Sequence, residues 1–111
     1  MPIRNWDALT SHGNIAGRRL AAAILQAGLE AADPYENVRR LVRIEGDRLL
    51  VGQPEFDPLG SPVQGTDVYD LNALGRIFVF GAGKGVQRVA KALEDSLGDR
   101  LTGGHIVDKK G

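Results

Sequence analysis

Residues 76–97 read RIFVFGAGKGVQRVAKALEDSL, and this stretch decides the fold that the sequence predicts. The β-forming run 77–80 carries no charge, as is typical of a strand buried on both faces of a parallel sheet. A glycine-rich turn follows at 81–85. Beyond the turn the apolar residues recur at helical spacing, at Val86, Val89, Ala90, Leu93 and Leu97. The stretch therefore predicts a strand, a tight turn and an amphipathic helix in direct succession.

The turn is the sharpest functional signal in the chain. It consists of Gly81, Ala82, Gly83, Lys84 and Gly85. A helix that begins here aims unpaired backbone N–H groups and the positive end of its dipole at an anion, and Lys84 adds a full charge. The dinucleotide fingerprint fails because position 86 is valine, and the phosphate-loop pattern fails because positions 78 and 85 are phenylalanine and glycine. Two interpretations stay open: an anion site, or a plain tight turn with a solvated lysine.

Composition narrows the class of protein. The 111 residues suffice for one small domain or a piece of a larger one, and 42% hydrophobic content suits a globular core. Lysine and arginine number 14, as do aspartate and glutamate, so the zero net charge favours neither a nucleic-acid surface nor an anionic membrane. The chain has no cysteine and no apolar run of bilayer length. We expect a soluble cytoplasmic protein.

The rest of the chain predicts further elements in order. Two helices are expected at 15–32, capped by Asn14 or Gly13, and at 34–41, where Pro34 suits a first helical position. A β-hairpin is expected at 42–51 around the turn Gly46-Asp47, and a loop at 53–67. Gly103-Gly104 should precede a last strand in HIVDKKG (residues 105–111). Together with the central strand and helix, that strand forms a β-α-β unit with parallel strands.

Other polar residues carry weaker signals. Asp108 and Lys109 follow the last strand at its carboxyl end, where open parallel sheets bind ligands, so they are candidates for the edge of the site. The alternative is a charged strand end without a binding role. His12 and His105 lie far apart with no supporting ligand spacing, so no metal site is expected in this chain.

Several segments together resemble the N-terminal region of the glycerate 2-kinase family, some members of which are labelled hydroxypyruvate reductases. The matching segments, in the order of the family, are GRRLAAAILQAGLEAADPYENVRRL (17–41), RIFVFGAGKG (76–85), VAKALEDSLGDRLTGG (89–104) and HIVDKKG (105–111). The resemblance implies the N-terminal part of a Rossmann-like three-layer α/β/α domain. It also implies that the rest of that domain, and a second α/β domain, lie outside residues 1–111.

The resemblance further implies an ATP-dependent kinase that phosphorylates glycerate with Mg²⁺, with its active site between two domains. The lysine that follows Gly-Ala-Gly in the family maps onto Lys84, near the transferring phosphate or the substrate carboxylate. Gly81, Gly83 and Gly85 carry over as the turn that places it, and Gly85 replaces a more frequent small residue. The metal ligands and any base would lie beyond residue 111. We therefore expect this piece alone to be inactive.

Two other functions remain open at this point. One is an NAD(P)-dependent hydroxypyruvate reductase, which the missing third fingerprint glycine disfavours. The other is a non-catalytic module that binds a phosphorylated ligand or oligomerises, either through an exposed sheet edge or through its first helix, whose apolar stripe is made mostly of small residues.

Overall fold

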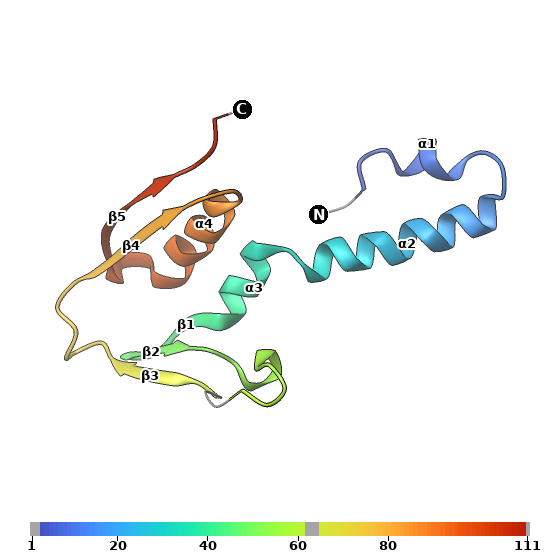
Figure 1. The fold of residues 1–111 in the computed structure, drawn as a ribbon. Helices are drawn as coiled ribbons and strands as arrows, with labels where there is room; N and C mark the ends of the chain where they lie inside the picture. Colours follow the sequence, from blue (N-terminus) through green and yellow to red (C-terminus); the bar gives the residue numbers. More distant parts are fainter. Residues whose placement is uncertain (1–2, 62–64, 111) are drawn as a thin grey trace. The chain divides into compact units, whose positions relative to one another are not determined.

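The computed structural model describes residues 3–61 and 65–110. The chain divides into two units, Met1–Asp33 and Pro34–Gly111, which we call the helical unit and the α/β unit. Figure 1 shows the elements of each unit, and each unit is described by itself.

The helical unit contains α1 (Trp6–Thr10) and α2 (Ile15–Ala31). The side chain of Asn14 caps α2 by accepting a 3.0 Å hydrogen bond from the backbone N–H of Gly17, so of the two predicted caps, Asn14 and Gly13, it is Asn14. Thr10 and Ala22 are buried. The guanidinium of Arg18 donates to the carbonyl of Leu9 at 3.3 Å and so ties α2 to the end of α1.

The α/β unit begins with α3 (Pro34–Leu41), β1 (Val42–Glu45) and β2 (Arg48–Val51), which confirms the predicted helix and hairpin. Gly46 takes a φ of 60° in the turn, a left-handed conformation that glycine adopts without steric cost. The short 3-10 turn η1 (Pro54–Phe56) lies in the predicted loop, of which residues 62–64 fall outside the described residues. β3 (Asp67–Asp70) then pairs antiparallel with β2, giving a sheet in the order β1-β2-β3.

The predicted β-α-β unit follows as β4 (Ile77–Ala82), α4 (Val86–Leu97) and β5 (Leu101–Val107), with the 3-10 turn η2 (Gly98–Arg100) before β5. β4 and β5 form a separate parallel sheet. The prediction that the last strand starts after the glycines was wrong, because Gly103 and Gly104 lie inside β5 and pair with Phe78 and Val79. A Cβ on Gly104 would lie 2.0 Å from the carbonyl oxygen of Val79, so the missing side chain is what admits this close approach.

Only one face of β4 is covered by the described residues, so the expectation of burial on both faces was wrong for this chain. α4 packs on the face that carries Val79 and Gly81. The rings of Phe78 and Phe80 point to the other face, 48% and 73% exposed, with their centroids 6.4 Å apart. The small core lies beneath α4, where Ala92 and Leu97 are buried.

Two polar links tie the elements of the α/β unit together. The hydroxyl of Tyr35 on α3 donates to Asp95 on α4 at 2.6 Å. The guanidinium of Arg100 in η2 lies 3.3 Å from the carboxylate of Asp47 in the β1–β2 turn, and the carbonyl of Asp47 accepts from the backbone N–H of Leu71. The predicted α/β class, with its helix pair, hairpin and β-α-β unit, is confirmed. None of the helices in residues 3–61 and 65–110 has the length and apolar character needed to cross a membrane.

Candidate functional site

Each glycine of the turn after β4 has its own structural reason. Gly83 and Gly85 have φ angles of 124° and 82°, which strain any residue with a side chain. Gly81 instead allows close packing, because a Cβ there would lie 2.7 Å from Cγ2 of Val86 at the start of α4. The three glycines therefore let the chain reverse tightly from the strand into the helix.

The turn also presents backbone N–H groups. Gly83 donates to the carbonyl of Val107 at 3.0 Å, and Val86 donates to the carbonyl of Gly83 at 3.4 Å. The N–H groups of Lys84 and Gly85 have no acceptor among the described residues. They lie at the N-terminal end of the 12-residue helix α4, where the helix dipole favours negative charge. The turn can thus offer donors to an anion.

Lys84 is exposed at the tip of this turn. No carboxylate in the described part of the chain forms an ion pair with it. Its ammonium group is therefore not committed to a structural salt bridge among the described residues, which agrees both with an anion site and with a solvated lysine.

The predicted site-edge residues lie at the same end of the sheet. Because Gly83 bonds to Val107, the turn lies beside the carboxyl end of β5, and Asp108 and Lys109 follow directly. The carboxylate of Asp108 accepts from the backbone N–H of Lys109 at 2.7 Å. The parallel pairing thus brings Lys84 and the pair Asp108–Lys109, far apart in sequence, to one edge of the sheet.

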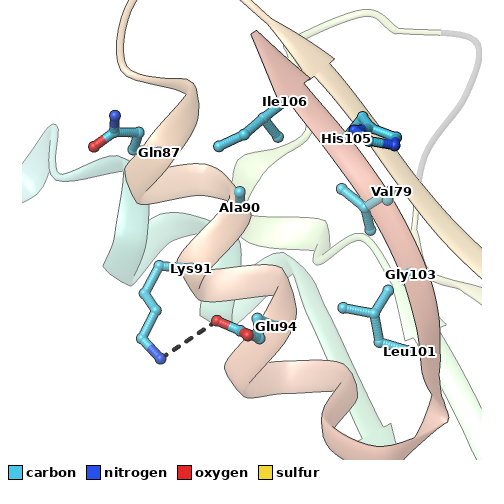
Figure 2. Close-up of a pocket in the computed structure, with 10 residues that line it drawn as sticks. Val79, Gln87, Ala90, Lys91, Glu94, Leu101, Gly103, His105 and Ile106 are labelled. Atoms are coloured by element: carbon cyan, nitrogen blue, oxygen red, sulfur yellow. Dashed lines mark ion pairs between the residues drawn. The ribbon is translucent and has the colours of Figure 1, made fainter. Parts of the chain in front are cut away.

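A separate hollow of about 450 Å³ lies between α4 and β5 (Figure 2). Its α4 wall carries Gln87, Ala90, Lys91 and Glu94, and its β5 wall runs from Leu101 to Ile106. Neither Lys84 nor the other turn residues line it. Because none of the turn residues lines this hollow, we interpret it as a packing groove rather than as the anion site.

An electrostatic cluster of Tyr35, Lys91, Glu94 and Asp95 links α3 to α4. Lys91 donates to Asp95 at 2.8 Å and lies 3.5 Å from Glu94, an ion pair drawn as a dashed line in Figure 2. Hydrogen bonds from Lys91 and Tyr35 lower the pKa of Asp95, while the bond to Asp95 raises the pKa of Tyr35 and of Lys91. Because Asp95 accepts from Lys91 on its own helix and from Tyr35 on α3, the cluster acts as a clamp between the two helices.

The sequence interpretation missed two features of this region. It assigned no electrostatic role to Tyr35, although a tyrosine facing a helix with the Lys91–Asp95 spacing of i and i+4 is a signal for such a clamp. It also missed Val107 as the anchor of the turn. Within the described residues, no three or more His, Asp or Glu side chains gather into a metal-binding group.

Together, the fold and the turn define an α/β domain that presents a glycine-rich strand–helix turn at the carboxyl edge of a parallel sheet. The model of one protein family, described as a domain of unknown function (DUF4147), matches residues 20–111, and the chain belongs to this family. The domain is found at the N-terminus of proteins of the glycerate 2-kinase and hydroxypyruvate reductase family, which confirms the resemblance seen in the sequence. Neither the curated proteins nor the solved structures contain a match to the chain.

Proposed function

We propose that this chain is the N-terminal part of an ATP-dependent kinase that phosphorylates glycerate, and that the turn 81–85 with Lys84 binds an anionic group of the reactants. The observation that carries the proposal is the exposed, uncommitted Lys84 on a glycine turn with open N–H donors, in a chain of this family. The anionic group is a phosphate of ATP or the carboxylate of glycerate.

Phosphoryl transfer suits such a turn. The reaction demands that the reactants be positioned and that charge spreading over the transferred phosphoryl oxygens be neutralised, with little covalent work by the protein. Rigid backbone donors and a lysine can position the reactants and neutralise this charge without reorganising during the reaction. Asp108 and Lys109 would border the bound group from the end of β5.

Mg²⁺ would accompany ATP. The described residues gather no cluster of ligands for this ion, so we assign its ligands, and any base, to the remainder of the N-terminal domain and to a second domain. Residues 1–111 alone should then bind anions weakly and turn over no glycerate. Turnover by the isolated chain would contradict this division of the site.

The contact between Val86 and Gly81 argues against the reductase alternative. In a dinucleotide fingerprint the third glycine lets the helix pack closely, but here a valine packs at that position, with Cγ2 2.7 Å from where a Cβ of Gly81 would stand. We therefore expect the complete protein to consume ATP with glycerate, and not NADH with hydroxypyruvate.

The decisive experiment compares two lysines of the same segment in the complete protein. Lys84→Ala should lower kcat/KM for glycerate phosphorylation by about 10²–10³-fold, the cost of losing one preorganised donor to a developing charge. Lys91→Ala, which removes a charge from the middle of α4, is the control and should keep near-normal turnover. Circular dichroism should show both variants folded. Near-normal turnover by Lys84→Ala would dispose of the proposal.

A further inference from the structure

Two lysines follow the parallel strands at the same step along the chain. The last paired residues of β4 and β5 are Ala82 and Val107. Two positions after each comes a lysine, Lys84 after β4 and Lys109 after β5. The 3.0 Å bond from the N–H of Gly83 to the carbonyl of Val107 holds the two segments together beyond the last pair. Because neighbouring strands lie about 4.8 Å apart, both lysines leave the chain at one small part of the sheet edge, toward which β4 and β5 run side by side in Figure 1.

The charge of these two lysines is not neutralised by the chain. Both are exposed, and neither forms an ion pair within the described part of the chain. Asp108 is the one carboxylate in the two segments that form this edge, residues 82–86 and 107–110, and it accepts from the backbone N–H of Lys109. Lys110 adds one more positive charge. The edge therefore carries an excess of positive charge, whose repulsion a bound anion would relieve.

This excess of charge bears on which anion the turn binds. The carboxylate of glycerate carries a single negative charge, which one lysine and the open N–H groups of the turn are enough to balance. A phosphate group carries more charge and three strong acceptor oxygens, and ATP presents three phosphates in a row. Two lysines on two neighbouring segments, beside the open N–H groups of Lys84 and Gly85, match such a ligand better than they match a carboxylate.

We propose, on the basis of the function proposed above, that Lys109 is the second cation of the site and that Lys84 and Lys109 together bind the phosphates of ATP. Lys84 and the open N–H groups reach the phosphates from the β4 side, and Lys109 reaches them from the β5 side. The bond between Gly83 and Val107 sets the position of one side relative to the other. The carboxylate of glycerate is then bound by residues outside this edge.

Steady-state kinetics of the complete protein distinguish the two anions. Lys109→Ala should raise KM for ATP at least about tenfold, the loss of one charge-assisted contact, and should leave KM for glycerate within about twofold. Lys109→Arg keeps the charge and should keep KM for ATP within about threefold of the unmodified protein. Lys110→Ala is the matched control, because it removes the same charge one residue farther along the chain, and it should change KM for either substrate by less than about twofold.

Two kinetic results would overturn the assignment of Lys109. One is a rise in KM for glycerate with KM for ATP unchanged, which would place the carboxylate at this edge. The other is an equal effect of Lys109→Ala and Lys110→Ala on KM for ATP, which would show a general effect of surface charge in place of a contact.

Direct binding keeps this test separate from the kinase assignment. Titration calorimetry with inorganic triphosphate should show at least about tenfold weaker binding to Lys109→Ala than to the unmodified complete protein, and titration with glycerate should show no change. If the complete protein phosphorylates no glycerate, the proposed function fails, and the triphosphate titration still decides what the two lysines bind. If Lys84→Ala lowers turnover while Lys109→Ala binds triphosphate as tightly as the unmodified protein, the kinase assignment stands and the role of Lys109 is refuted.

Discussion

The backbone N–H of Gly83 donates a 3.0 Å hydrogen bond to the carbonyl of Val107. This bond extends the pairing of β4 and β5 by one residue past the last paired residues of the two strands, Ala82 and Val107. It occupies the N–H of Gly83, whereas the N–H groups of Lys84 and Gly85 have no acceptor among the described residues. The conformation of the candidate anion site therefore depends on the parallel strand that lies beside it.

The contact between Gly81 and Val86 should be the most sensitive packing point of the turn. Gly81→Ala places a methyl group 2.7 Å from Cγ2 of Val86 and should lower the free energy of unfolding by about 1–3 kcal/mol. Adding Val86→Ala should recover part of that loss, since it removes the clashing atom. Denaturant unfolding of the two single variants and the double variant measures this coupling. Equal, additive losses would show that the two residues do not meet.

Two adjacent glycines of β5 should respond in opposite ways. Gly104→Ala puts a Cβ 2.0 Å from the carbonyl oxygen of Val79 and should cost at least about 3 kcal/mol, because the strands must separate. Gly103→Ala meets nothing within 4 Å and should change stability by less than about 1 kcal/mol, in the stabilising direction. Thermal unfolding of the pair checks the register of β5, and similar losses at both positions would mean that the register is different.

Gly85 has a left-handed conformation, so substitutions at this position should lower the free energy of unfolding most for the residues that tolerate a positive φ least. With a φ of 82° at this position, Gly85→Val should cost about 1–2 kcal/mol or more and distort the turn, while Gly85→Asn should be milder. Under the proposed function, ATP affinity in the complete protein should fall in the same order, from glycine to asparagine to valine. Calorimetric titration measures it. If the ATP affinity of the variants does not follow this order, the turn does not take part in nucleotide binding.

The clamp of Tyr35, Lys91 and Asp95 should make stability depend on pH in two places. The pKa of Asp95 is lowered by the bonds from Lys91 and Tyr35, so its contribution is present above the pKa of the unfolded chain and is lost as the pH falls through the folded value. The pKa of Tyr35 is raised by Asp95, so its contribution is present below the unfolded pKa and is lost as the pH rises through the folded value.

Substitutions can separate the acid dependence of stability from the alkaline dependence. Tyr35→Phe should weaken the alkaline dependence and leave the part that comes from Lys91, whose pKa Asp95 also raises. Asp95→Asn should weaken both the acid and the alkaline dependence, because Asp95 is the shared acceptor. Unfolding midpoints measured from acid to alkaline pH provide the readout. A Tyr35→Phe profile identical to that of the unmodified chain at alkaline pH would show that the bond contributes nothing in solution.

Local signals in the sequence predicted much of this fold. Asn14 before an apolar-periodic segment marked the start of α2, Pro34 marked the start of α3, and the residues around Gly46 marked the hairpin. The turn between β4 and α4 could be predicted because glycines must occupy its strained positions. In each case the deciding interaction joins residues that are close in sequence.

Long-range contacts account for what the sequence could not predict. Gly103 and Gly104 look like a loop signal until the close approach to Val79 is known. The pairing of β3 with β2 depends on how the intervening loop closes, and the clamp at Asp95 depends on how α3 lies on α4. For the candidate site, the residue types of the turn could be predicted, and so could the strand end that lies next to it. The role of Val107 as its anchor could not.

The ion pair between Asp47 and Arg100 carries a consequence for how the α/β unit forms. It joins two short connections that are 53 positions apart, one between strands of the antiparallel sheet and one leading into the parallel sheet. Such a contact forms only after the intervening chain is ordered, so it belongs to the late, slow stage of folding that non-local topology imposes. Because both side chains are largely exposed, at 43% and 65%, the ion pair should couple the unfolding of the two sheets by no more than about 1 kcal/mol.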